Sequence, residues 1–140
     1  MIRYRILPHT ADARVRAYGH TMPGVFENCA FGLLKLMKLS PGCRTGDSTE
    51  IRKIRLKARG SEDLLVRWLN EIIFLVQADG FLPSDIKVEN CRGCVLKASV
   101  KGRTNRGGPP AGREVKAATY HGLEIKNTGG KLTAEVLFDL

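Results

Sequence analysis

The sequence predicts an α+β fold of sandwich-like α/β character, with two helices packed on mixed or antiparallel sheets built from strand-helix-strand units. Two observations support this fold class. Apolar residues recur at three- and four-residue spacing in two segments, as in amphipathic helices, whereas other segments alternate apolar with polar residues, as in half-buried strands. The chain has 140 residues, of which 43% are hydrophobic, and no linker divides it, so we expect one domain over residues 1–140.

Two short strands are predicted at the start of the chain. Residues 2–7 form the first strand, which ends at Pro8. Residues 13–18 alternate basic with apolar side chains, and Gly19 ends this second strand.

A first helix follows, with Thr21 as its N-cap and Pro23 in the first turn, where a missing N–H does no harm. Residues 40–42 should end it, and residues 42–49 should form a loop. One face of the helix is apolar and comprises Met22, Val25, Phe26, Cys29, Ala30, Leu33, Leu34 and Met37.

Residues 51–59 switch to a period of two, which predicts a third strand with one buried and one cationic face. The cationic face carries Lys53, Arg55, Lys57 and Arg59. A second helix should then begin with Ser61 as its cap and end at residues 79–80. Its buried stripe comprises Leu64, Leu65, Trp68, Leu69, Ile72, Ile73 and Val76.

The rest of the chain predicts strands alone. The expected strands are residues 85–91, 94–101, 114–119, 121–126 and 131–140. Arg92-Gly93 should turn the first two into a hairpin, residues 102–113 should form a Gly-, Pro- and Arg-rich loop, and residues 127–130 should form the last turn.

The chain is strongly basic, with 23 Lys and Arg against 14 Asp and Glu, which favours encounter with a polyanion. The basic strand and the Arg103, Arg106 and Arg113 loop could follow an RNA phosphate backbone. The alternative is a solvated outer face that keeps the sheet soluble. Aromatic residues make up 6% and are not interleaved with these charges, which disfavours a stacking platform for single strands.

Cysteines and apolar runs indicate the compartment. The four cysteines do not form a dense disulfide pattern, which favours a reducing compartment. The apolar run at residues 72–76 is too short for a membrane span, so we expect a cytoplasmic protein with no membrane partner. Cys91-x-x-Cys94 falls at the expected hairpin rather than at a helix start, and no second pair completes a zinc site, so we interpret it as incidental.

Motifs for catalysis do not stand out. No nucleophile elbow, phosphate loop or carboxylate pair is evident, and the three histidines are scattered, so binding is favoured over catalysis. Asp12, Asp139 and the carboxylate of Leu140 could hold a hard divalent cation if the first and last strands were neighbours. Solvated surface aspartates are the alternative.

Five stretches, taken together, resemble the archease family. They are His9-Thr10-Ala11-Asp12 with residues 17–19, Phe26-Glu27-Asn28-Cys29-Ala30, residues 63–71 with Phe74-Leu75, residues 114–121 with Lys116-Ala117-Ala118-Thr119-Tyr120-His121, and the terminal Phe138-Asp139-Leu140. They occur in the family's order and cover the chain from end to end.

The resemblance implies an activator without its own chemistry, which promotes guanylylation and repeated turnover of an RtcB-type RNA ligase in tRNA splicing. It also implies a divalent metal site at Asp12, Asp139 and Leu140, with Ca²⁺ as the first candidate and Mg²⁺ or Mn²⁺ as others. Contact with the ligase, or indirect and weak contact with tRNA, is expected at His9, Lys53, Arg55, Lys57, Lys116, Tyr120 and His121.

Two alternatives to a ligase activator stay open: a stand-alone basic RNA-binding module and a chaperone for RNA-modifying methyltransferases. The sequence also departs from the family pattern, because Arg103 follows Gly102 where an acidic residue is common. The loop after Arg103 is unusually basic, which puts in question how it would meet a ligase.

Overall fold

The computed structural model describes residues 2–7, 12–39, 49–104 and 112–140. The described elements, in chain order, are β1 (Tyr4–Leu7), β2 (Asp12–Gly19), α1 (Met22–Leu36), β3 (Glu50–Lys57), α2 (Ser61–Gln77), β4 (Phe81–Arg92), β5 (Val95–Thr104), β6 (Ala117–Thr128) and β7 (Lys131–Asp139).

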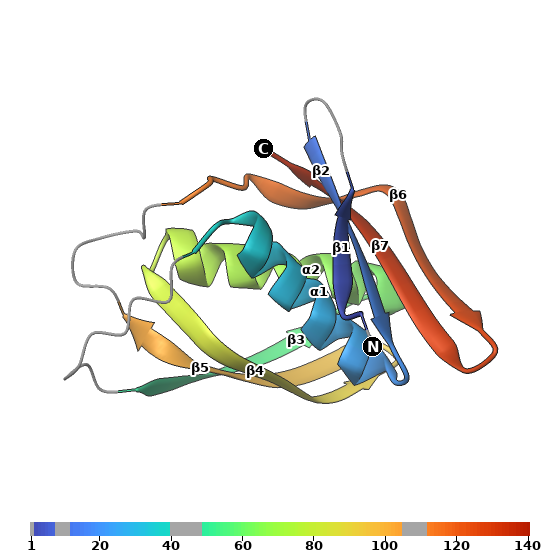
Figure 1. The fold of residues 1–140 in the computed structure, drawn as a ribbon. Coiled ribbons are helices and arrows are strands. Elements are labelled where there is room, and N and C mark those ends of the chain that lie inside the picture. The colour runs from blue at the N-terminus through green and yellow to red at the C-terminus, as the bar shows by residue number, and fades with distance from the viewer. Residues whose placement is uncertain (1, 8–11, 40–48, 105–111) are drawn as a thin grey trace.

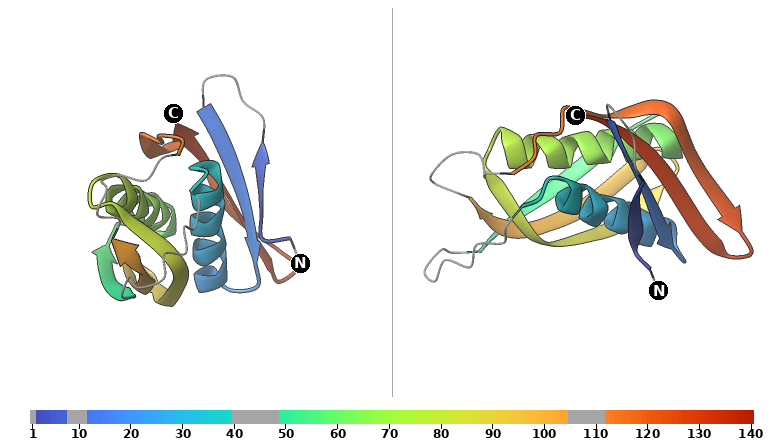
Figure 2. Two further views of the ribbon diagram at one scale, coloured as in Figure 1. Left: turned by 60° about the vertical axis from the view of Figure 1, so that its left-hand side comes forward. Right: turned by 45° about the horizontal axis from the view of Figure 1, so that its top comes forward.

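The two helices lie between two antiparallel sheets (Figure 1). Sheet A has the strand order β1-β2-β7-β6, and sheet B has the order β3-β5-β4. Both helices contact both sheets, and Figure 2 shows α1 between them from a second direction. The α+β prediction is therefore confirmed, with two refinements. The helices lie between two separate sheets, and every strand pairing among the described residues is antiparallel, so neither sheet is mixed there.

Sheet A is built on the pairing of β2 with β7, the first and last long strands of the chain. Their register runs without interruption from Asp12 opposite Asp139 to Gly19 opposite Leu132. Val15 and Ala17 of β2 are fully buried toward the helices, and the residues between them face outward. The metal site was predicted on the condition that the first and last strands are neighbours. The first strand, β1, is not next to β7, but the second strand, β2, begins at Asp12 and pairs with β7, so the two aspartates are still brought together.

Sheet B confirms the predicted cationic strand at three of its four basic residues, whereas Arg59 lies beyond the end of β3. Ile54 faces the helices, whereas Lys53, Arg55 and Lys57 are exposed on the outer face. The β4–β5 hairpin is present, but its turn is Gly93-Cys94 rather than Arg92-Gly93. The positive φ of 57° at Gly93 explains the shift, because the first turn position then needs a residue that tolerates this conformation.

The start of α1 agrees with the prediction. Thr21 Oγ1 accepts a hydrogen bond from the Gly24 N–H at 3.1 Å, and Pro23 lies in the first turn. The helix ends at Leu36, earlier than residues 40–42, and Lys38 has a positive φ of 53°. Most of the predicted loop at 42–49 lies outside the described residues.

The predicted cap of α2 is wrong. Gly60 is the N-cap, Ser61 is the first helical residue, and no side chain caps the helix at that position. Asp63 instead accepts a hydrogen bond through Oδ2 from the Arg59 N–H at 3.0 Å. An acid in the first turn therefore fixes the chain entering the helix, a role that local sequence preference had assigned to the serine.

The two strands predicted at 114–119 and 121–126 are one strand, β6, with an irregular register between Thr119 and Glu124. Gly122, at a φ of 64°, lies in the irregular part and lets the strand continue through it. The last turn is also shorter than expected. It consists of Gly129-Gly130, both with positive φ, as hairpin turns that match strand twist require.

The two helices are tied together at the centre of the core. Trp68 of α2 is fully buried, and its indole Nε1–H donates to the backbone carbonyl of Phe26 in α1 at 2.9 Å. A buried indole needs such a partner, since its N–H would otherwise lose its hydrogen bond to water. This contact sets the position of α2 relative to α1.

We expect Trp68→Ala to lower the free energy of unfolding by about 3–5 kcal/mol, because a large cavity opens in the core. Trp68→Phe keeps most of the volume but removes the indole hydrogen bond to the Phe26 carbonyl, and should cost about 1–3 kcal/mol. Urea unfolding followed by far-ultraviolet circular dichroism measures both, because the chain has a single tryptophan and its removal abolishes the fluorescence signal. Equal costs for the two variants would contradict a dominant volume effect.

Candidate functional site

An acidic corner, formed by Asp12 and Asp139, lies at the end of sheet A where the C-terminal end of the described chain meets the start of β2 (Figure 1). The two residues are directly opposite each other in the β2–β7 pairing. Side chains at such positions share one face of the sheet, with Cβ atoms about 4.5–5.5 Å apart. Asp139 is exposed and Asp12 is half-buried, and Leu140 follows directly.

Strand β6 also reaches the acidic corner. Ala117 pairs with Asp139 across the β6–β7 ladder, and the Lys116 N–H donates to the Asp139 carbonyl at 2.8 Å. Lys116, predicted as a partner contact, is exposed there. The structure therefore brings one predicted contact residue beside two predicted metal ligands.

The chemistry of the acidic corner suits a hard cation. Directly opposed like charges destabilise a sheet, so two neighbouring carboxylates favour a cation between them. Carboxylate oxygens are the ligands that Ca²⁺ and Mg²⁺ prefer. Among the described residues no group of three His, Cys, Asp or Glu side chains could hold a metal ion, so a third protein ligand would have to be another oxygen, such as one from Leu140.

Two side-chain amides of α2 hold the edge of β6 and the segment before it. Gln77 accepts from the Val115 N–H and donates to the Val115 carbonyl, both at 2.9 Å. Asn70 does the same at Ala118, at 2.8 and 3.4 Å. Each amide satisfies a backbone donor and a backbone acceptor, as a neighbouring strand would. We call these two contacts the amide clamps.

A third polar contact continues the line of the amide clamps. The Tyr120 hydroxyl of β6 donates to Asp63 Oδ1, and Arg67 Nε lies 3.2 Å from Asp63 Oδ2. The Tyr120 hydrogen bond, followed by that from the Arg59 N–H, lowers the pKa of Asp63 to about 2. The same bond raises the pKa of Tyr120.

The polar stripe of α2, formed by Asp63, Asn70 and Gln77, was not predicted from the sequence, although a signal was present. Asp63, Asn70 and Gln77 recur every seven residues, so they lie close to one line along a helix of 3.6 residues per turn. Polar residues at that spacing, between apolar ones, indicate contact with polar backbone.

Two exposed aromatic side chains accompany this stripe. Tyr120 is 59% exposed and Phe74 is 55% exposed. Phe74 is one turn from both Asn70 and Gln77, so it lies on the side of α2 that carries β6. Large exposed aromatics are enriched in protein–protein interfaces. Phe74 was absent from the predicted contacts, although its place outside the buried stripe could have identified it.

The predicted contact residues divide into two groups. Lys116 and Tyr120 lie along the contact between β6 and α2 that contains the amide clamps and the Tyr120–Asp63 hydrogen bond, which we call the β6–α2 line. His121 is exposed next to Tyr120. Lys53, Arg55 and Lys57 lie on the outer face of sheet B, across the helical layer from sheet A (Figure 1). His9 lies outside the described residues.

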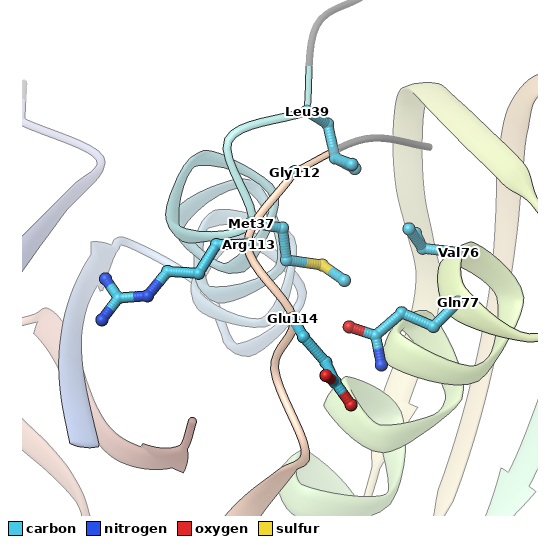
Figure 3. Close-up of a pocket in the computed structure, with 7 residues that line it drawn as sticks. All are labelled: Met37, Leu39, Val76, Gln77, Gly112, Arg113 and Glu114. Carbon is cyan, nitrogen blue, oxygen red and sulfur yellow. The ribbon is translucent and has the colours of Figure 1, made fainter. Parts of the chain in front are cut away.

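A separate pocket of about 310 Å³ lies where the two helices end (Figure 3). Its lining consists of Met37, Leu39, Val76, Gln77, Gly112, Arg113 and Glu114. The backbone packs closely there, because a Cβ on Gly112 would approach the Met37 carbonyl to 2.4 Å. Among the described residues predicted to bind a metal, a partner or RNA, Arg113 of the basic loop is in this lining, and the pocket is a packing feature beside the Gln77 clamp.

The three cysteines in the described part of the chain lie where the sequence predicts. Cys91 is half-buried near the end of β4, Cys94 is exposed in the hairpin turn, and Cys29 is buried in α1. Burial raises the pKa of Cys29 to about 12 and that of Cys91 to about 11, so both thiols are protonated at neutral pH. In the described part of the chain, no helix is long and apolar enough to span a bilayer.

Comparison with known proteins gives consistent results. The model of the Archease protein family (MTH1598/TM1083) matches residues 4–140. The chain is 33% identical to a protein archease of Methanothermobacter thermautotrophicus, over 94% of each chain, and 32% identical to one of Thermococcus kodakarensis over the full length of both.

Two solved structures are similar in fold. The solution structure of Methanobacterium thermoautotrophicum protein 1598 matches with a TM-score of 0.75 and 31% identity, over 98% of each chain. The crystal structure of a Thermotoga maritima archease, described as a possible chaperone, matches with a TM-score of 0.67 and 24% identity, over 100% of this chain and 98% of that one.

We expect Asn70→Asp and Gln77→Glu each to lower the free energy of unfolding by about 1–3 kcal/mol at neutral pH. Each carboxylate can still accept from the backbone N–H, but it cannot donate to the carbonyl and leaves that acceptor unpaired. Urea unfolding checks this. The matched control is Asn90→Asp at an exposed position of β4, which should change stability by less than about 0.5 kcal/mol. Equal effects at all three positions would contradict the amide clamps.

A second prediction concerns the pH dependence of stability. Because the folded-state pKa of Asp63 is about 2, below its ordinary value of 3.8, the ionised carboxylate stabilises the fold above about pH 4. This contribution is lost as the pH falls from about 4 to about 2. Asp63→Asn should therefore be less stable than the parent at pH 6, and the two should converge toward pH 2 in a urea series. Glu62→Gln, exposed in the same turn, should follow the parent throughout, and a constant gap for Asp63→Asn would contradict the assignment.

Proposed function

The chain belongs to the archease family, and on that premise we propose that it is a non-catalytic activator of an RtcB-type RNA ligase in tRNA splicing. It would promote guanylylation of the ligase and repeated turnover. The observation that carries the proposal is the direct opposition of Asp12 and Asp139 at one end of the β2–β7 pairing. This acidic corner is a fixed feature on a chain whose net charge is +9.

A divalent ion, with Ca²⁺ as the first candidate and Mg²⁺ or Mn²⁺ as others, would be held by Asp12, Asp139 and Leu140. Such an ion neutralises phosphate charge in nucleotidyl transfer. The protein's own residues keep the carboxylates side by side through the strand register and anchor them to β6 through the Lys116 N–H. The corner is thereby preorganised for a cation.

The exposed side chains beside the acidic corner support a protein partner. Phe74 and Tyr120 offer apolar area, and Lys116 offers charge. The amide clamps and the Tyr120–Asp63 hydrogen bond hold this surface on α2, so little conformational freedom would be lost on docking. We therefore assign ligase docking to the β6–α2 line.

The test is RNA ligation by the cognate RtcB-type ligase under multiple-turnover conditions, with this protein at substoichiometric amounts. We expect a large rise in product per ligase with the parent, and a return to the unstimulated level with Asp12→Asn or Asp139→Asn, because each removes one charge from the acidic corner. Glu62→Gln, which removes a carboxylate elsewhere, should stimulate like the parent. Calcium binding measured by calorimetry should weaken in parallel with stimulation.

Two results would contradict this proposal. Full stimulation by Asp12→Asn and Asp139→Asn would separate the acidic corner from activation. No stimulation by the parent, in either turnover or guanylylation, would remove the ligase as the partner and favour a chaperone role toward RNA-modifying enzymes.

A further inference from the structure

We propose that the outer face of sheet B binds the phosphate backbone of a nucleic-acid duplex without reading its bases. This surface lies across the helical layer from sheet A and its acidic corner (Figure 1). The proposal is therefore independent of the ligase. Its evidence is the strand register, the charge of the face and the pairing state of its cations.

The strand register brings cations from three strands onto one face. Lys53 is level with Lys87 across β5, Arg55 is opposite Lys97, and Lys57 is level with Arg92. Lys101 lies opposite the exposed Ile51. All seven basic side chains are exposed: Lys53, Arg55, Lys57, Lys87, Arg92, Lys97 and Lys101. The same face carries two carboxylates, Asp85 and Glu89, so its charge is strongly positive.

These cations are available to a ligand. None of the seven basic residues forms an ion pair with another described residue. Three basic residues on the exposed face of sheet A differ. Arg14 and Arg16 both pair with Glu135, at 3.4 and 3.5 Å, and Lys126 pairs with Glu124 at 3.1 Å. Basic side chains without an ion pair are therefore more numerous on the outer face of sheet B than on that of sheet A, where Arg5 and Lys131 are in none of the ion pairs of the described chain.

The spacing of the cations suits a backbone that passes over the sheet. Alternate residues along a strand are about 6.7 Å apart, and neighbouring strands are about 4.8 Å apart, so the basic side chains form a grid rather than one point site. Long flexible Lys and Arg side chains can follow successive phosphates from such a grid.

The composition of the face distinguishes a duplex from other polyanions. It has no aromatic side chain on which unpaired bases could stack, which disfavours a single strand. Protein–protein interfaces are depleted of lysine and have an apolar centre, whereas here Ile51 at the edge strand is the exposed large apolar residue. Duplex RNA is recognised largely through its shape and phosphates, for which cations alone suffice.

The experiment measures the affinity of the full chain for a labelled 20-base-pair RNA duplex between 50 and 200 mM salt, by fluorescence anisotropy. The triple variant Lys53→Gln, Arg55→Gln, Lys57→Gln should bind at least about tenfold more weakly at 100 mM salt. The plot of log affinity against log salt concentration has a negative slope, and its magnitude should decrease by about one for each cation removed. Lys97→Gln with Lys101→Gln, on another strand, tests the face independently if the triple variant does not fold.

The matched control removes the same number of charges from sheet A, as Arg5→Gln, Lys126→Gln and Lys131→Gln. This control variant should have the same salt dependence as the parent, and its affinity for the duplex should stay within about threefold of the parent value. Equal losses in both triple variants, or no loss in the sheet B variants, would overturn the proposal, because net charge alone would then explain binding. Tighter binding to phosphatidylserine vesicles or to a poly-glutamate peptide than to the duplex would also overturn it. A DNA duplex distinguishes RNA from DNA as the source of the phosphates.

Discussion

The pairing of β2 with β7 is the contact on which the rest of the structure depends. It joins the first and last long strands of the chain along their whole length, and α1 packs against β2 from inside. A one-residue slip would turn Val15 and Ala17 to solvent, so burial fixes the register. That same register places Asp12 opposite Asp139. Core packing therefore decides whether the two carboxylates meet.

Helix α2 connects this sheet to the remainder of the molecule through two kinds of contact. Its apolar side contributes Trp68 to the core, where the indole donates to Phe26. Its polar stripe binds the backbone at Val115 and Ala118 through the amide clamps. The side-chain amides of α2 thus occupy backbone N–H and C=O groups that would otherwise be open at the sheet edge, which protects these groups from pairing with another chain.

The arrangement separates charge across the molecule. The acidic corner and the two exposed aromatic residues belong to sheet A and α2, whereas the seven basic side chains of the proposed duplex-binding face belong to sheet B, and the helical layer lies between (Figure 1). A cation site and a polyanion site on one face would compete for each other, because opposite charges a few ångströms apart pair with one another. Placing them on opposite faces leaves both available, so a partner and a nucleic acid could be engaged together.

Local sequence alone predicted both helices, the Thr21 cap and the outward cations of β3, because each depends on neighbours within a few residues. It failed at Ser61, where Asp63 binds the backbone that enters the helix, and at the two strands merged in β6, where Gly122 lets the strand continue through an irregular register. The resemblance to a family identified Asp12 and Asp139, yet only the tertiary structure shows them directly opposed. A local sequence pattern indicates which side of a helix or strand is buried. It does not indicate which distant helix or strand covers that side, because the register of the paired strands depends on the packing of the whole core.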